Sequence, residues 1–272
     1  MKQKELILNR DWDILLVFDA CRYDYFKRYY TDKLNGGTLR KCISPSTFTF
    51  GWMKEMFSRE MEDVIFISTE PVKDKIYDAT KRMKHGKDFD TNDYFCEVID
   101  LHSKAYVEPG LIYPVVVNDA IEKTIKYHPN KKIVAKYWQI HDPYIFWLKK
   151  GPEYRDMGIS SVRLPEIRKI LYNLISDETY WTIMSKLNFK PENWLNALWL
   201  KHGVSGIIQG YCMDLLLTLD YMKKIIKKYP EKKVAITSDH GERLGEYGKY
   251  SHGGKRTKVI KEIPWYESWT KK

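Results

Sequence analysis

The chain has 272 residues, of which 43% are hydrophobic and 30% are charged, and its formal net charge is +10 at pH 7. A chain of this length can bury a sizeable core, either as one domain or as a domain with an elaborate insertion. No apolar run reaches about 18 residues, so no membrane span is expected. The excess of lysine suits an anionic, phosphorylated substrate or peripheral contact with an anionic surface, and no nucleic-acid-binding motif accompanies it.

The cysteines and the N-terminal region indicate a reducing compartment. The four cysteines are scattered and show no paired spacing, which favours reduced thiols over a disulfide framework or a zinc knuckle. The first predicted strand begins near Asp13, which leaves no room for the apolar segment and cleavage site of a signal peptide. We therefore expect a cytoplasmic protein.

The first predicted strand, at 13–20, ends in a candidate metal ligand. Its sequence DILLVFDA is an almost continuous apolar run, which is typical of a central parallel strand. Asp19 therefore sits at the carboxyl end of a buried strand, where a carboxylate can bind a cation. The alternative is that Asp19 caps the helix predicted next, at 21–30, but capping does not require an acid at the end of so buried a run.

A hydroxyl-rich stretch follows at 41–57 (KCISPSTFTFGWMKEMF), where the proline should break a short strand before a helix begins near Gly51. A hydroxyl at a helix N-terminus can act as a nucleophile on phosphorus, because backbone N–H groups and the helix dipole stabilise the negative charge. It can equally be an ordinary helix cap. Spacing alone does not separate the four hydroxyl residues Ser44, Ser46, Thr47 and Thr49.

The middle of the chain predicts alternating strands and helices that lead to a histidine. We expect strands at 64–68, 94–101 and 132–137, a charged surface excursion at 74–93 and an amphipathic helix at 115–127. His141 follows the last of these strands, in a polar cluster that Pro143 ends. His141 could bind a metal, hold a substrate oxyanion or protonate a leaving group, and a structural loop histidine is the alternative.

From 153 to 229 the chain is predicted to be mostly helical, with helices at 164–175, 179–187, 192–200 and 204–228. We interpret residues 1–272 as a single domain with a mostly helical insertion at about 153–203, which could form a lid. Asp214 and Asp220 fall on the last helix and are expected to be at the surface or in salt bridges.

The stretch at 234–254 (VAITSDHGERLGEYGKYSHGG) carries the strongest signal for a metal site. A β-branched strand runs directly into Asp239 and His240, then a glycine-rich loop, then His252. A carboxylate and an imidazole side by side at a strand end are suitable metal ligands. With Asp19 they would make three of the four ligands of a tetrahedral site. A final segment at 259–269 is expected to add an edge strand.

Together these motifs resemble the alkaline phosphatase superfamily, specifically its sulfatase-like branch. VFDACRYDYF is similar to the branch's opening Asp-x-x-Arg-x-Asp signature, which maps the metal-binding aspartate onto Asp19. SPSTFT resembles a Ser-Pro-x-x-Trp-Thr segment, with Phe48 in place of the tryptophan, and places the nucleophile on Thr49. QIHDPY resembles Gln-Pro-His-x-Pro-Tyr, with His141 on the substrate side and Ile140 where proline is usual.

The stretch SDHGERLGEYGKYSHG resembles the metal-binding loop of lipid A phosphoethanolamine transferases. That resemblance assigns Asp239 and His240 as metal ligands and places His252 against the phosphoryl group. The similarity extends from about residue 11 to 265 and is weakest at 153–203. A formylglycine-type sulfatase would need Cys-x-Pro-Ser-Arg, but here Cys42 is one residue out of register and the arginine is missing.

The resemblance implies an α/β/α sandwich around a mixed, largely parallel sheet, as in alkaline phosphatase. It implies a divalent ion, Zn²⁺ or Mn²⁺, held by Asp19, Asp239, His240 and Thr49, with a possible second ion. The expected function is that of a phosphatase, phosphodiesterase or phosphotransferase that acts through a phospho-threonine at Thr49, assisted by His141 and His252. The alternatives are a non-catalytic binding or scaffold protein of the same fold, and a sulfate-ester hydrolase.

Overall fold

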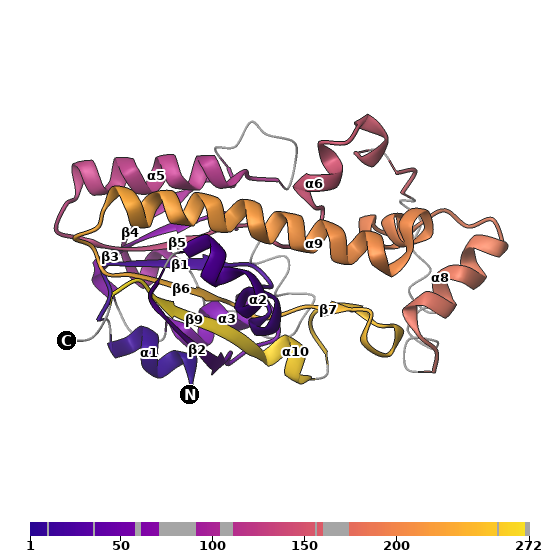
Figure 1. Ribbon diagram of the computed structural model, residues 1–272, viewed down its shortest axis with the longest axis horizontal. Coiled ribbons are helices and arrows are strands. Elements are labelled where there is room, and N and C mark those ends of the chain that lie inside the picture. Colours follow the sequence, from indigo (N-terminus) through magenta and orange to yellow (C-terminus); the bar gives the residue numbers. More distant parts are fainter. Residues whose placement is uncertain are drawn as a thin grey trace.

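A seven-stranded sheet forms the centre of the molecule (Figure 1). The computed structural model describes residues 1–9, 11–34, 36–57, 61–70, 91–103, 111–155, 157–159, 174–254 and 256–269. The strands lie in the order β2-β9-β6-β1-β5-β3-β4. Their bounds are β1 Ile14–Phe18, β2 Thr38–Ile43, β3 Met61–Ser68, β4 Phe95–Asp100, β5 Lys132–Lys136, β6 Val234–Ser238 and β9 Glu262–Glu267.

The sheet is mixed and largely parallel, as the sequence predicts. β1 pairs in parallel with β5 and β6, and β3 pairs in parallel with β4 and β5. β9 runs antiparallel to both β2 and β6. The prediction of an edge strand at 259–269 is wrong in position, because β9 lies inside the sheet. Its aromatic side chains explain this placement, since Trp265 and Tyr266 are buried in clusters on opposite faces.

Helices cover both faces of the sheet, which confirms the expected α/β architecture (Figure 1). In β1, Ile14, Leu16 and Phe18 belong to one hydrophobic cluster, whereas Leu15 and Val17 belong to the other. This division follows from strand geometry, because successive side chains point to opposite faces. The first cluster is covered by α2 (Tyr23–Leu34), α5 (Pro114–Tyr127) and α9 (Trp194–Lys228), and the second by α1 (Gln3–Asn9) and α3 (Thr49–Met56).

The helical part of the chain contains η2 (Pro152–Tyr154), α8 (Asp177–Lys186) and the first half of α9. α9 is interrupted at Gly203, which has φ 64° and ψ −165°, so the helices predicted at 192–200 and 204–228 are consecutive parts of one long element. Most of the helix predicted at 164–175 and of the excursion predicted at 74–93 lies outside the described residues. The division into one domain with an insertion stays a prediction.

Short elements gather beyond the carboxyl ends of the parallel strands. They are α6 (Ile145–Leu148), β7 (Arg243–Leu244), η3 (Glu246–Gly248), β8 (Tyr250–Ser251) and α10 (Lys258–Lys261), and a 3-10 turn, η1 (Thr91–Asp93), precedes β4. β7 and β8 form a hairpin, with Arg243 opposite Ser251. Within the described ranges, none of the helices has both the length and the hydropathy required of a membrane span.

Candidate metal centre

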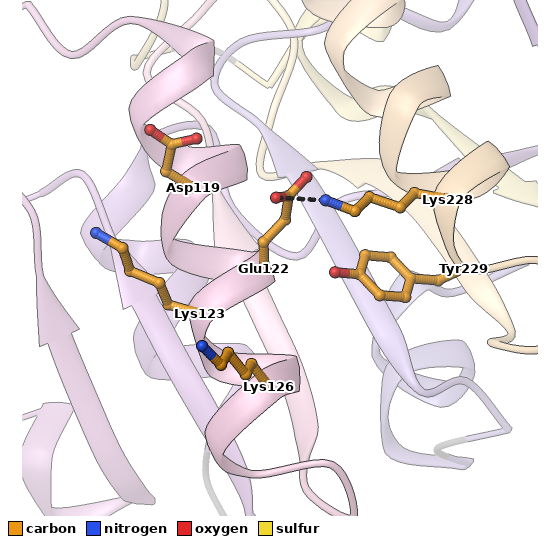
Figure 2. Close-up of a pocket in the computed structure, with 6 residues that line it drawn as sticks. All are labelled: Asp119, Glu122, Lys123, Lys126, Lys228 and Tyr229. Atoms are coloured by element: carbon orange, nitrogen blue, oxygen red, sulfur yellow. Dashed lines mark hydrogen bonds and ion pairs between the residues drawn. The ribbon is translucent and has the colours of Figure 1, made fainter.

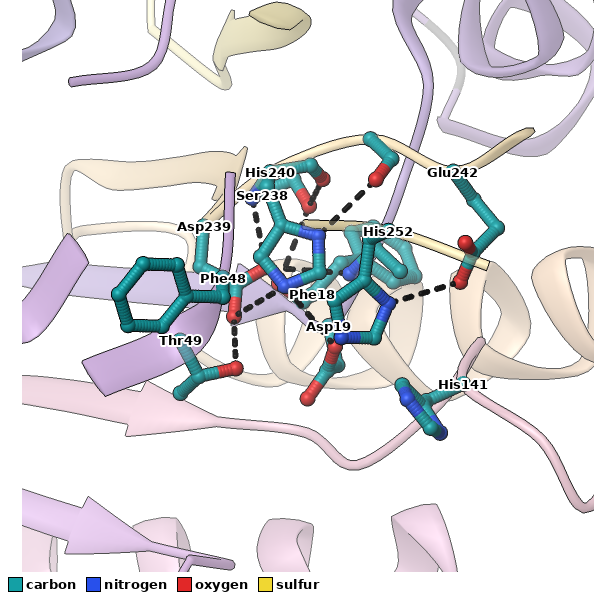
Figure 3. A network of polar contacts seen from close by, with 12 residues as sticks. Phe18, Asp19, Phe48, Thr49, His141, Ser238, Asp239, His240, Glu242 and His252 are labelled. Carbon is teal, nitrogen blue, oxygen red and sulfur yellow. Dashed lines mark hydrogen bonds and ion pairs between the residues drawn. The ribbon is translucent and has the colours of Figure 1, made fainter. Parts of the chain in front are cut away.

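The parallel strands β1 and β6 bring three of the predicted ligands together (Figure 3). Phe18 pairs with Ser238, so Asp19 and Asp239 leave adjacent strands at the same edge of the sheet. With His240, each offers one ligand atom, and these atoms lie within 4.8 Å of one another. All three side chains are buried. The cluster therefore has the composition and the spacing of a metal ligand set.

The hydrogen bonds of His240 leave one ring nitrogen free for a metal. Nδ1 lies 2.9 Å from the carbonyl oxygen of Gly241, which can only accept, so Nδ1 carries the proton. Nε2 then presents its lone pair to the cluster. Burial lowers the pKa of His240 to about 4, so the imidazole is neutral at pH 7. A neutral imidazole held by a hydrogen bond at its other nitrogen is the form that ligates metals.

Unpartnered buried atoms in this cluster fit a divalent cation. Nε2 of His240 and Oδ1 of Asp19 have no hydrogen-bond partner and lie 3.7 Å apart. Oδ2 of Asp239 lies 3.6 Å from the same Nε2. Leaving a buried polar group unsatisfied costs about 1–3 kcal/mol, and a cation among the three atoms would satisfy the two that have no partner. A set of one imidazole and two carboxylates suits zinc or manganese.

Asp239 is held in its ionised form by the groups around it. Its Oδ1 accepts hydrogen bonds from the backbone N–H groups of His240, at 2.6 Å, and Ala20, at 3.1 Å. Burial alone would raise its pKa, but the charge of Lys136 and the hydrogen bonds from Ala20 and Thr49 oppose burial, and the pKa is lowered to about 2. A carboxylate that stays charged at all physiological pH values is a suitable metal ligand.

Thr49 is the hydroxyl that reaches this cluster. It is the first residue of α3, and its Oγ1 donates a hydrogen bond of 2.8 Å to Oδ2 of Asp239. Ser44 Oγ instead donates to the backbone carbonyl of Asp239, at 2.5 Å, and Ser46 Oγ bonds to the backbone of Phe48. No hydrogen bond from the Thr47 side chain to the cluster is found in the described chain. The structure thus distinguishes the four hydroxyl residues by their hydrogen bonds, which spacing alone could not do.

The two other predicted histidines form a second group beside the first. The ring centres of His240 and His252 lie 4.3 Å apart, and those of His252 and His141 lie 4.9 Å apart. Nδ1 of His252 bonds to Oε2 of Glu242 at 3.2 Å, and Nδ1 of His141 lies 2.6 Å from the carbonyl of Asp142. Atoms of His141, Glu242 and His252 lie within 4.8 Å of one another, so this group could also hold a cation.

The charges near these two histidines favour their protonated forms. Burial lowers the pKa of His141, but Asp142, Asp19 and Glu242 outweigh it and raise the pKa to about 10. Burial lowers the pKa of His252 as well, but the charge and the hydrogen bond of Glu242 outweigh burial and raise it. Burial thus lowers the pKa of His240, whereas the nearby carboxylates raise the pKa of His141 and of His252.

Sequence reasoning missed Lys136 and Glu70. Lys136 is the last residue of β5 and is fully buried, and its Nζ lies 2.6 Å from Asp19 Oδ2, 3.2 Å from Glu70 Oε1 and 3.4 Å from Asp239 Oδ2. Burial alone would lower the pKa of Lys136, but these carboxylates outweigh burial and raise it. A lysine that ends the buried run KIVAK was the available signal, because an unpaired lysine is almost never fully buried.

The remaining signature residues, Arg22 and Asp24, position the loop rather than the metal. The Arg22 guanidinium donates to both carboxylate oxygens of Asp24, at 3.0 and 2.8 Å, and to Glu246 at 2.5 Å. It also donates to the backbone carbonyl of Glu242 at 3.3 Å. Arg22 therefore ties the start of α2 to the loop that follows His240.

The helical part of the chain supports the segment that carries His252. Asp177, at the start of α8, accepts a hydrogen bond of 2.9 Å from the backbone N–H of Tyr250 and lies 3.4 Å from Lys249 Nζ. The Tyr250 hydroxyl donates to Glu178 at 2.5 Å. α8 thus braces the β7–β8 hairpin from outside, and His252 follows directly after β8.

The prediction that Asp214 lies at the surface or in a salt bridge is wrong. Asp214 is buried, not at the surface, and its carboxylate accepts from the backbone N–H groups of Ile145, at 2.7 Å, and Phe146, at 2.9 Å. It therefore holds the first turn of α6, four residues after His141, because helix N-termini have unsatisfied N–H groups. Asp220 meets the expectation, since it pairs with Lys33 at 2.8 Å.

A surface hollow lies at the other end of the molecule. It has a volume of about 290 Å³ and lies between the C-terminal ends of α5 and α9 (Figure 2). Lys228 bonds to Glu122 across it at 2.7 Å. Because both helix ends lead into the starts of strands β5 and β6, the hollow is remote from the metal centre. It contains none of the predicted site residues.

No protein-family profile and no curated protein sequence matches the chain. Solved structures do match. The lipooligosaccharide phosphoethanolamine transferase A (EptA) of Neisseria meningitidis superposes with a TM-score of 0.59 at 15% identity, over 93% of this chain and 46% of that one. The chain has the alkaline phosphatase fold, in its sulfatase-like form. It spans about half the length of that transferase.

Two further structures share this fold. The C-terminal periplasmic domain of phosphoethanolamine transferase EptC from Campylobacter jejuni has a TM-score of 0.53 at 18% identity, over 93% of this chain and 77% of that one. A phosphonate monoester hydrolase from Silicibacter pomeroyi has a TM-score of 0.52 at 12% identity, over 93% and 67%. At these identities the likeness establishes the fold, and the roles of the site residues rest on the geometry above.

Proposed function

We propose that this chain is a metal-dependent enzyme that hydrolyses or transfers phosphate esters through a covalent phospho-threonine at Thr49. One observation carries the proposal. The Thr49 hydroxyl bonds to Asp239 at the N-terminus of α3, beside the unpartnered Oδ1 of Asp19 and Nε2 of His240. The names of the similar structures, two transferases of phosphoethanolamine and a phosphonate monoester hydrolase, support this reaction class.

Asp19, Asp239, His240 and Thr49 would hold the cation. When bound, zinc or manganese supplies a Lewis acid that lowers the pKa of the threonine hydroxyl and offsets charge on the phosphoryl group. Asp239 orients the Thr49 hydroxyl through its hydrogen bond. Thr49 is the first residue of α3, so the N-terminus of this helix lies beside the same cluster, and a helix N-terminus favours an anion.

His141 and His252, whose pKa values nearby carboxylates raise, supply the proton that the reaction needs. When the cation binds, the Thr49 hydroxyl would release its proton to solvent. Thr49 Oγ1 then forms a bond to phosphorus while the bond to the leaving oxygen breaks, and His252 or His141 gives that leaving oxygen a proton. The same imidazole then takes a proton from water or an acceptor alcohol. The oxygen of that water or alcohol attacks phosphorus, and the bond from phosphorus to Thr49 Oγ1 breaks, which returns Thr49 to its deprotonated form. Protons and charges balance over the two steps, which makes hydrolysis and transfer variants of one mechanism.

The deciding experiment compares Thr49→Ala with Thr47→Ala. Both positions lie in the same segment, and the hydroxyl of Thr49 is the one that bonds to Asp239. We expect Thr49→Ala to lower turnover of nitrophenyl phosphate mono- or diesters by roughly 1000-fold or more, because its nucleophile is gone. Thr47→Ala should stay near the wild-type rate. Both variants should bind zinc or manganese, measured by metal analysis after dialysis.

Intact-mass measurement after brief reaction should show one added phosphoryl group on the wild type and none on Thr49→Ala. Near wild-type rates in Thr49→Ala would overturn the assignment of the nucleophile. A metal-loaded wild type that cleaves none of the phosphate esters would favour the non-catalytic alternative. Cleavage of aryl sulfate alone would favour the sulfate-ester alternative.

A further inference from the structure

Lys136 lies where the described cluster is most negative. Its ammonium nitrogen contacts carboxylates from three different places in the chain, Asp19 after β1, Glu70 after β3 and Asp239 after β6. β5 pairs with both β1 and β3, with Val17 opposite Lys136, so the sheet itself places this side chain between those strand ends. The side chain is fully buried, and a buried lysine requires such partners.

The contact with Asp19 gives the two oxygens of that carboxylate different surroundings. Oδ2 accepts the hydrogen bond from Lys136 at 2.6 Å, the shortest of the lysine's three contacts. Oδ1 has no partner and lies 3.7 Å from the free Nε2 of His240. The lysine thus fixes the rotation of the carboxylate so that one oxygen, Oδ1, is presented to the cation position.

We propose that Lys136 is a positioning residue, a built-in cation that holds Asp19 as a one-oxygen metal ligand and offsets the charge of the ligand carboxylates before the metal arrives. This inference rests on the metal centre of the proposed function. Lys136 keeps Asp19 and Asp239 in place in the metal-free protein, where they would otherwise repel each other. It also keeps Asp19 Oδ2 away from the metal.

This role predicts how the metal response changes in Lys136→Met, which removes the charge at similar volume. Without metal, the variant should melt well below the wild type, because its buried carboxylates lose their cation. Zinc should raise its melting temperature by more than it raises that of the wild type, because the metal then supplies the missing charge. Zinc affinity, measured by competition with a chelator, should be tighter, because the stabilisation that a ligand gives grows with its affinity.

Val134→Ala is the matched control, since it removes packing from a buried position of the same strand, β5, without touching the charges. Its loss of melting temperature should be the same with and without zinc. If Lys136→Met behaves like this control, Lys136 has only a structural role and the proposal is overturned. Weaker zinc binding in Lys136→Met would overturn it as well.

A double-mutant cycle with Asp19→Asn tests the pairing directly in metal-free protein. Each single variant leaves a buried charge without its main partner, whereas the double variant removes both. We therefore expect the double variant to melt higher than the sum of the single losses predicts. If Lys136→Met alone does not fold, folding of the double variant supports the pairing, and failure of both overturns it.

These measurements need no substrate, so their outcome is separate from that of the proposed function. A zinc-loaded wild type that cleaves no ester would contradict the proposed enzymatic function, but the test of Lys136 would remain valid. If esters are cleaved, Lys136→Met at saturating zinc should lose roughly 100-fold in kcat, because a misplaced ligand misplaces the nucleophile. An unchanged kcat would show that the orientation of Asp19 does not matter for the reaction.

Discussion

At the scale of single residues, three histidines of similar geometry have their pKa values shifted in different directions because their neighbours differ. In each, Nδ1 faces an oxygen atom, of the Gly241 carbonyl for His240, of the Asp142 carbonyl for His141 and of the Glu242 side chain for His252. Burial dominates at His240, whereas nearby carboxylates dominate at the other two. At one edge of the sheet, the surroundings thus lower the pKa of one imidazole and raise the pKa of two others.

His240→Gln should lose the metal. Removing residues that only orient a ligand typically costs 10- to 100-fold in metal affinity, so we expect a direct ligand to cost at least about 100-fold. His128→Gln is a suitable control, because His128 is exposed and lies at the end of α5. Zinc titration against a chelator measures both affinities. Equal zinc affinity in the two variants would show that His240 is not a ligand.

Asp214 should make stability depend on pH. Burial raises its pKa to about 7 from 3.8, although the N–H groups of Phe146 and Ile145 oppose the shift. Between these values the folded protein holds a proton that the unfolded chain has released, so stability falls as pH rises through this window. Asp214→Asn does not titrate and should lack this loss, which amounts to as much as about 4 kcal/mol.

Urea unfolding at pH 5 and pH 8 measures the difference. Asp220→Asn, on the same helix but paired with Lys33 at the surface, should follow the wild type. If the stability of Asp214→Asn depends on pH as that of the wild type does, then the group that takes up the proton on folding is not Asp214.

At the scale of elements, the N-terminal end of α8 acts on the site through the β7–β8 hairpin. Asp177→Ala removes the acceptor for the Tyr250 N–H and a partner of Lys249. We expect a loss of about 1–3 kcal/mol in the free energy of unfolding, since a buried donor loses its acceptor. Turnover should fall because His252 follows this hairpin, while zinc content should be unchanged.

Hydrogen exchange at the Tyr250 amide gives the direct measurement, and it should speed up in Asp177→Ala. Ser185→Ala, at an exposed position of the same helix, is the control and should leave exchange at Tyr250 unchanged. Unchanged exchange in Asp177→Ala would mean that α8 does not brace the hairpin.

The elements near the site also show what a sequence can predict. Strands β1 and β6 and the ligands at their ends were predictable, because a buried run that ends in an acid is a local pattern. Lys136 was missed since its meaning depends on Asp19, Glu70 and Asp239, which only the sheet brings together. Thr49 could be singled out only by resemblance, because each hydroxyl in its segment has the same local chemistry.

At the scale of the whole molecule, the fold class was predictable and the strand order was not. Alternating strands and helices indicate a largely parallel sheet. The position of β9 follows from contacts more than 200 residues apart, such as Lys41 opposite Pro264, and no local pattern encodes those. The predicted cytoplasmic location and anionic partners stay predictions.

Metal removal should destabilise the whole protein. A ligand at 100 times its dissociation constant stabilises the folded state by about 2.7 kcal/mol. For a chain of this size, a loss of that order lowers the melting temperature by roughly 5–10 °C. Calorimetry before and after chelator treatment measures the shift, and re-added zinc should restore it. His240→Gln should show no such response, and a response equal to wild type would place the stabilising metal elsewhere.

The inserted position of β9 has a consequence for biosynthesis. A ribosome completes β2 at Ile43, but its neighbour in the sheet ends only at Glu267. β2 therefore stays without this partner while more than 200 further residues are made, whereas β6 lacks it only during synthesis of the stretch between Ser238 and Glu262. A nascent chain that stalls before Glu262 therefore leaves the edges of two strands unpaired. Unpaired strand edges can pair with other chains, so early release of such a chain favours aggregation.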